Sequence, residues 1–339
     1  MAIPRVFFVC AAVLAASSCL ASAEDGAKPD AGKAKPDFAA WNLEALPPEL
    51  AERVRRRDAS FARLGLTTVN RGVYSRLGLW PPSDRVIRVC FMDGSQELRR
   101  EIANYANEWT KAQTSLKLDF GDGEEMRECD PDDGKISHIR IGYDEEGYWS
   151  LVGQDSIQLA SQFVSSMNLQ DFDTEPPDPE EFRRVVLHEF GHALGFHHEH
   201  QNPVSSCEDE FDWEHIYTYL AGPPNNWPKE QVDFNMRRLD QSGLVADQFD
   251  RDSIMLYTFP PDYFKSGEQS SCFAPYTTAL SPGDRHMIEQ MYPADRVTDV
   301  SRYEAARKVL LETAEEAKTD QVTRTDALAT LRRYLPDAK

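Results

Sequence analysis

The chain has 339 residues, 41% of them hydrophobic, and a formal net charge of −20 at pH 7. This length suits one or two domains with accessory segments, and the apolar content supports a sizeable core. A nucleic-acid partner is not expected, because binding phosphates requires a basic surface. Solubility is the plain explanation of the acidity, and selection of cationic substrates is a second one.

The N-terminus has the pattern of a secretory signal peptide, assigned to residues 1–23. A single charge precedes an apolar run that is too short to cross a membrane, and residues 21–23 (ASA) form a small-residue cleavage site. We therefore expect a secreted protein, extracellular or periplasmic, without stable membrane insertion. In an alternative interpretation Cys19 becomes a lipid-anchored N-terminus, although Ala16 stands where a leucine is expected.

Residues 24–75 are predicted to form a pro-segment or linker. The stretch 24–37 is rich in Ala, Lys, Asp and Pro, a composition typical of disorder. A helix is predicted around Pro47–Leu64, and it carries a cluster of four arginines at positions 53 and 55–57. A plain N-terminal extension is the alternative.

The segment 76–296 is predicted to be the catalytic domain. Residues 95–113 have apolar residues at helical spacing, and four segments have strand patterns. The expected strands are 86–91, 115–120, 138–142 and 156–160. This order favours an α+β fold with a mixed sheet and helices packed on it.

The strongest helix signal covers Pro179–Leu194. Asp178 is a suitable N-cap, Pro179 suits the first helical position, and two glutamates favour the positive end of the helix dipole. Gly195 can adopt a left-handed conformation and end the helix.

This helix carries a metal-binding pattern. His188 and His192 are four residues apart and share one helix face, so both imidazoles can reach one metal. The turn at Gly195 lets His198 return to the same point. Three protein ligands leave a fourth position open, as in catalytic rather than structural zinc sites. Glu189, beside a ligand, can act on a bound water without binding zinc.

The other histidines do not fit this register. Gly195 fixes the position at which the third ligand returns to the metal, and His197 and His200 are not at that position. They are assigned to the surroundings of the site or to the surface. The isolated histidines are assigned structural roles; they are His138, His215 and His286.

The pattern H-E-x-x-H-x-x-G-x-x-H, here residues 188–198, resembles the metzincin signature. Residues 253–257 (SIMLY) resemble the methionine turn of astacins, and Glu199 after the third histidine is also astacin-like. The resemblance implies a twisted mixed sheet, an active-site helix and a smaller C-terminal subdomain with the methionine turn. It implies that Met255 forms the floor under the zinc and that Tyr257 supports the transition state.

The resemblance covers about residues 74–293 and departs from animal astacins in its cysteines, since none immediately precedes the active-site helix. Four cysteines remain after signal cleavage, and an exported protein would form two disulfides from them, with three possible pairings. Order along the chain favours Cys90–Cys129 and Cys207–Cys272.

The expected function is a secreted zinc-dependent endopeptidase. One Zn²⁺ is held by His188, His192 and His198, and peptide bonds are hydrolysed through a zinc-bound water with Glu189 as general base. Residues 156–161 are expected to offer an edge strand for an extended protein or peptide substrate. A monomer is expected. The alternative function is a non-catalytic, zinc-stabilised binding module.

Latency is expected to work without a cysteine, because residues 24–89 contain none. An acidic residue such as Asp58 could block the zinc instead. In astacins the glutamate after the third histidine pairs with the new N-terminus of the mature enzyme. If Glu199 does the same, processing occurs near Arg71 or Arg76.

Residues 297–339 are predicted to be a helical C-terminal appendage. Ser301 and Glu304 fit a capping box, and a second helix is predicted over Thr325–Leu335. No chemistry is visible in this segment.

Overall fold

The computed structural model describes residues 44–66, 78–122, 125–223, 225–238 and 248–338. These residues fall within one compact unit, Phe38–Lys339. The predicted signal peptide and residues 24–43 lie outside the described residues, as do Arg71 and Arg76. In the part of the chain that is described, no helix has the length and apolar character needed to cross a membrane.

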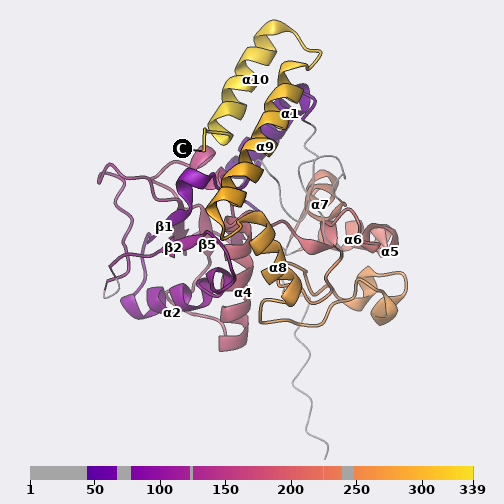
Figure 1. Cartoon of the computed structure of the whole chain (residues 1–339). Coiled ribbons are helices and arrows are strands. Elements are labelled where there is room, and N and C mark those ends of the chain that lie inside the picture. Colours follow the sequence, from indigo (N-terminus) through magenta and orange to yellow (C-terminus); the bar gives the residue numbers. More distant parts are fainter. Residues whose placement is uncertain (1–43, 67–77, 123–124, 224, 239–247, 339) are drawn as a thin grey trace, which may run out of the picture. The chain divides into compact units, whose positions relative to one another are not determined.

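A five-stranded mixed sheet forms the first layer of the fold (Figure 1). Its strands are β1 (Val86–Phe91), β2 (Lys117–Asp119), β3 (Ile139–Gly142), β4 (Tyr148–Ser150) and β5 (Met167–Leu169). The strand order is β2-β1-β3-β5-β4, and every pairing is parallel except that of β4 with β5. The α+β prediction with a mixed sheet is therefore confirmed, and the antiparallel strand β4 forms one edge.

Helices pack on this sheet and around it. They are α1 (Pro48–Arg63), α2 (Gln96–Ala106), α3 (Asp155–Gln158), α4 (Pro179–Ala193), α5 (Cys207–Glu210), α6 (Trp213–Leu220), α7 (Lys229–Met236), α8 (Pro282–Met291), α9 (Arg296–Glu315) and α10 (Gln321–Tyr334). The main core joins the sheet to α2, α4 and α8. Two buried indoles fix α4 in it, because Trp80 and Trp109 donate Nε1–H bonds of 3.0 and 2.9 Å to carbonyls of that helix.

The predictions for the longer helices are largely confirmed. The Asp178 side chain accepts from the amides of Glu180 and Glu181, so α4 begins at Pro179 as expected. The helix predicted over 95–113 ends earlier, at Ala106, and a short 3-10 turn follows at Trp109–Lys111. The side chain of Asn107 bonds the Ala103 carbonyl, which satisfies an exposed group at the helix end.

The strand prediction for 156–160 is wrong. Asp155–Gln158 form α3 instead, and the substrate-edge role assigned to residues 156–161 has no strand to carry it. A pattern of alternating polarity over only five residues is too short to distinguish a strand from a turn of helix. The edge strand of this sheet is β4, and both β4 and β5 were missed because each has only three residues.

A second cluster forms the smaller C-terminal subdomain around α5, α6 and α7. Its buried side chains include Phe211, Phe259 and Tyr263, and the Cys207–Cys272 disulfide lies among them. Cys90–Cys129 ties β1 to the loop that follows β2. Both predicted pairings are confirmed.

The C-terminal helices α9 and α10 pack on each other and against α1 (Figure 1). Their shared cluster contains Phe61 and Leu64 from the α1 side and Leu331 and Leu335 from the α10 side. The predicted helix start at Ser301 is wrong, because α9 begins at Arg296. Asp295 is the N-cap instead, and its carboxylate accepts from the Thr298 amide at 2.8 Å.

Candidate metal centre

The end of α4 brings the three predicted histidines together. His188 and His192 lie on the buried face of the helix. Gly195 has a φ of 107°, a conformation that other residues rarely adopt, so the chain turns there. His198 returns along this turn, and its Nε2 lies 3.1 Å from Nε2 of His192.

Two backbone carbonyls orient the helix histidines. Nδ1 of His188 lies 2.8 Å from the Ile254 carbonyl, and Nδ1 of His192 lies 2.9 Å from the Phe196 carbonyl. A carbonyl only accepts, so both Nδ1 atoms carry a proton, and each Nε2 presents a lone pair when its imidazole is neutral. The two Nε2 atoms are 3.2 Å apart, so the two lone pairs are held close together.

This arrangement fits a zinc ion. Nitrogens at ~2.0–2.1 Å from a tetrahedral zinc stand about 3.3 Å from one another, close to the observed spacing. Facing lone pairs repel unless a cation lies between them. The donor set of three imidazoles is one that zinc prefers, and together with Glu44 its ligand atoms lie within 4.8 Å of one another.

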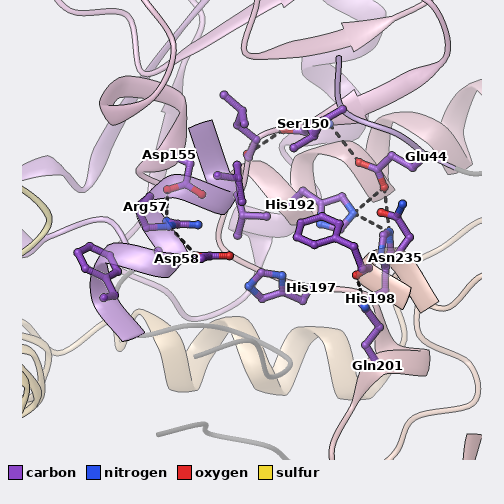
Figure 2. Close-up of a pocket in the computed structure, with 17 residues that line it drawn as sticks. Glu44, Arg57, Asp58, Ser150, Asp155, His192, His197, His198, Gln201 and Asn235 are labelled. Atoms are coloured by element: carbon purple, nitrogen blue, oxygen red, sulfur yellow. Dashed lines mark hydrogen bonds and ion pairs between the residues drawn. The ribbon is translucent and has the colours of Figure 1, made fainter. Parts of the chain in front are cut away.

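Glu44 is the fourth member of this cluster, and sequence reasoning missed it. Its Oε2 lies 2.9 Å from Nε2 of His198 and 3.0 Å from that of His192 (Figure 2). The same oxygen lies 3.6 Å from Nε2 of His188. Its Oε1 accepts from the Ser150 amide of β4 at 3.2 Å. No motif marks Glu44, which simply precedes α1.

The suggestion that Asp58 blocks the metal is therefore wrong. The Asp58 carboxylate pairs with Nε of Arg57 at 2.8 Å, and it is not part of the histidine cluster. Asp58 lies in the third turn of α1, whereas Glu44 precedes the helix and can extend along the cleft.

The charges of Glu44 and the histidines are coupled. Burial opposes ionisation of Glu44, but the charge of His192 and hydrogen bonds with the three histidines lower its pKa well below the usual range. Burial lowers the pKa of His198 to about 4, so this imidazole is neutral, as a metal ligand must be.

Glu189 is buried beside the cluster. Its Oε2 is buried without a hydrogen-bond partner among the described residues. Burial and the neighbouring Glu44 carboxylate raise the pKa of Glu189 well above the usual value. An orphaned buried carboxylate oxygen next to a metal site is suited to hold a water or a proton.

Tyr257 reaches the same point from the loop after residue 253. Its hydroxyl donates to Oε2 of Glu44 at 3.0 Å, and its ring packs on that of His198 with centroids 4.4 Å apart. Burial and the Glu44 charge raise its pKa well above the usual value, so the hydroxyl keeps its proton.

Met255 lies under the active-site helix. A Cβ at Gly191 would stand 2.3 Å from Sδ of Met255 and 3.0 Å from Trp109, so only glycine fits there. The Met255 carbonyl accepts from the Glu199 amide at 2.9 Å, and the Ser253 hydroxyl accepts from the Met255 amide at 3.0 Å. These bonds hold the turn against the histidine loop.

We expect Gly191→Ala to lower the free energy of unfolding by about 1–3 kcal/mol, because the added methyl overpacks the Met255 contact. Gly222→Ala is the matched control, since its Cβ would meet nothing closer than 3.3 Å. Denaturant midpoints measure both. Equal midpoint shifts in the two variants would contradict the close packing of Gly191.

His197 and His200 are not part of the histidine cluster. His200 is buried, its Nε2 lies 3.0 Å from the Asn235 carbonyl, and its ring stacks on that of His198 with centroids 5.2 Å apart. His197 lines the cavity beside the site. Of the isolated histidines, His138 accepts from the Arg88 amide with Nδ1 at 2.9 Å, which agrees with a structural role.

Comparison with known proteins points in one direction. No family model matches the chain. A stretch of 73 residues is 37% identical to "Astacin-like metalloprotease toxin 4" of Loxosceles laeta, covering 22% of this chain and 54% of that protein. The chain thus spans about half the length of this curated relative.

The solved structure of myroilysin is similar over most of its length. It is 29% identical, with a TM-score of 0.55, and the match covers 65% of this chain and 98% of that one. These similarities support a metalloendopeptidase, and they agree with the motif, the mixed sheet and the histidine cluster. The chain is therefore similar to astacin-like zinc proteases in sequence, fold and donor set.

Proposed function

We propose that the chain is the latent precursor of a secreted, zinc-dependent endopeptidase. The observation that carries this proposal is the convergence of three Nε2 atoms beside the buried carboxylate of Glu189. Zinc would be held by His188, His192 and His198. The two disulfides and the toxin relative support an extracellular location.

In the proposed mechanism, zinc when bound supplies Lewis acidity to the scissile carbonyl and the attacking water. Glu189 takes the proton of that water and delivers it to the leaving amine. Burial, which raises the pKa of Glu189, suits this role, since the acid form must be accessible near neutral pH. The Tyr257 hydroxyl donates a hydrogen bond to the developing oxyanion, as it does to Glu44 in the precursor.

Strand β4 is proposed to align the substrate. It is the edge of the sheet, and its Ser150 amide points into the site, where it donates to Glu44. An extended peptide would pair with such a free edge through its backbone. This role replaces the one assigned to residues 156–161.

Glu44 is proposed to keep the precursor inactive. Its carboxylate lies where the fourth zinc ligand would bind, and it also uses the Ser150 and Tyr257 donors that a substrate needs. Activation would then require a cut after α1, near Arg71 or Arg76, at the end of the proposed pro-segment 24–75. The proposed domain limits remain those expected from the sequence, 1–23, 24–75, 76–296 and 297–339.

Glu199 is proposed to receive the new N-terminal amine. Its Oε1 already accepts from the Asn202 side chain and the Asp250 amide at 2.8 and 2.9 Å. Burial raises its pKa to about 8 nevertheless, so a neighbouring cation would stabilise its charged form.

Chelator-reversible proteolysis tests the proposal. We expect processed protein to cleave denatured protein and peptides, to lose this activity with a chelator, and to regain it with Zn²⁺. The alternative, a zinc-stabilised binding module, predicts zinc-dependent stability without turnover. Absence of hydrolysis in processed, zinc-loaded protein would favour that alternative and reject the endopeptidase.

A further inference from the structure

The cavity at the metal centre continues to a second charged group. It has a volume of about 110 Å³, and His192 and His198 line one end of it. Arg57, Asp58 and Asp155 line another part of the same cavity (Figure 2). A peptide bound at the histidines would therefore have space to send a side chain towards Asp155.

In the precursor an arginine fills this position. Nη1 of Arg57, from α1, lies 2.5 Å from Oδ1 of Asp155, from α3, and both side chains are nearly buried. The Arg57 guanidinium also lies over the ring of Tyr334, 5.6 Å from its centroid. Arg57 thus meets a carboxylate and an aromatic face together, a combination that suits a guanidinium.

The receptor half of this contact also has hydrogen bonds that do not involve α1. The Tyr334 hydroxyl, from α10, donates to Oδ1 of Asp155 at 2.8 Å. Gln154 donates to the Tyr334 carbonyl at 2.9 Å, and Gln158 donates to the Arg333 carbonyl at 3.3 Å. The end of α10 is therefore joined to α3 by hydrogen bonds that involve no residue of α1.

Removal of α1 takes away the cation together with Asp58, its second partner. Asp155 is only 3% exposed, and burial raises its pKa even with Arg57 beside it. Without α1 the Asp155 carboxylate faces the cavity with no cation beside it, and a new cation bound there would restore the pairing. The vacated position is part of the cavity at the metal centre, so a substrate side chain is the group placed to replace it.

We propose that Asp155 and Tyr334 form a subsite for a cationic side chain, arginine above all, of the peptide substrate. This inference rests on the proposed endopeptidase function and gives it a specificity. Arg57 occupies the subsite in the precursor as a substitute for the substrate. The C-terminal helices then have a role in recognition, because Tyr334 belongs to α10.

The test uses the full-length secreted chain after processing, with the activating protease inhibited. Peptides of one sequence carry arginine at each position in turn, and each has a partner with neutral, isosteric citrulline. We expect one position at which arginine raises kcat/KM about 10- to 100-fold over citrulline, the range for a hydrogen bond to a charged group. Asp155→Asn should remove this ratio.

Asp132→Asn is the matched control, since this substitution removes the same charge from an exposed loop. Tyr334→Phe should lower the arginine ratio by about two- to tenfold through loss of one hydrogen bond. Equal rates on arginine and citrulline peptides in the unmutated protein would overturn the subsite, whether or not Asp155→Asn folds. A preference for arginine over citrulline that persists in Asp155→Asn would also overturn the subsite. Failure to cleave any peptide would instead reject the endopeptidase and the subsite with it.

Discussion

Glu189→Gln is expected to bind zinc and to lose about 10²–10⁴-fold in kcat, the contribution of a positioned general base. Glutamine keeps the size of the side chain but cannot take a proton from water. The imidazoles of His188 and His192 are oriented by the Ile254 and Phe196 carbonyls, so their position does not depend on this carboxylate. Zinc content by mass spectrometry and steady-state kinetics on the processed protein measure the two effects.

Two controls accompany this variant. Glu180→Gln makes the same change in the exposed first turn of α4 and should leave kcat unchanged. Tyr257→Phe should lower kcat by only about five- to tenfold, since one hydrogen bond is lost. A Glu189→Gln enzyme that retains zinc and substantial turnover would remove Glu189 from the mechanism.

Glu44→Gln is expected to raise the basal peptidase activity of the uncleaved precursor by about 10- to 100-fold, because a charged contact of this kind stabilises by roughly 1.5–3 kcal/mol. The carboxylate of Glu44 makes its contacts with the histidines, Ser150 and Tyr257 at once. A neutral amide is a poorer partner for all of them and a poorer zinc ligand. The measurement is hydrolysis by full-length protein shown to be intact by mass spectrometry.

Glu49→Gln is the matched control for this variant, since Glu49 lies five residues later and is exposed. Its basal activity should equal that of the unmutated precursor. If Glu44→Gln also stays at that level and gains activity only after processing, latency would have to come from α1 covering the cleft and not from the carboxylate.

The histidine cluster could be predicted from the sequence because its rules are local. The spacing of His188 and His192 follows from the helical period, and a left-handed turn at Gly195 directs His198 back to them. The disulfides followed chain order, and α4 followed its Asp178 cap. Features fixed within one or two turns of helix are those that a single sequence encodes most directly.

The missed features depend on contacts between distant parts of the chain. Glu44 and His192 are 148 residues apart in sequence, and no pattern near Glu44 indicates the contact. Strands β4 and β5 gain their definition from pairing with each other and with β3, not from three residues of their own. The start of α9 was misassigned because Asp295 and Ser301 are both acceptable caps, and packing decides between them.

The apolar cluster shared by α1 and α10 has a consequence for activation. Phe61, Leu64 and Leu66 are buried against Leu331 and Leu335, and burial of each large apolar side chain stabilises by roughly 1.5–3 kcal/mol. A cut beyond α1 leaves this contact intact. We therefore expect the severed N-terminal piece to remain bound as a non-covalent inhibitor, so that enzyme activity appears with its dissociation and rises on dilution rather than at the moment of cleavage.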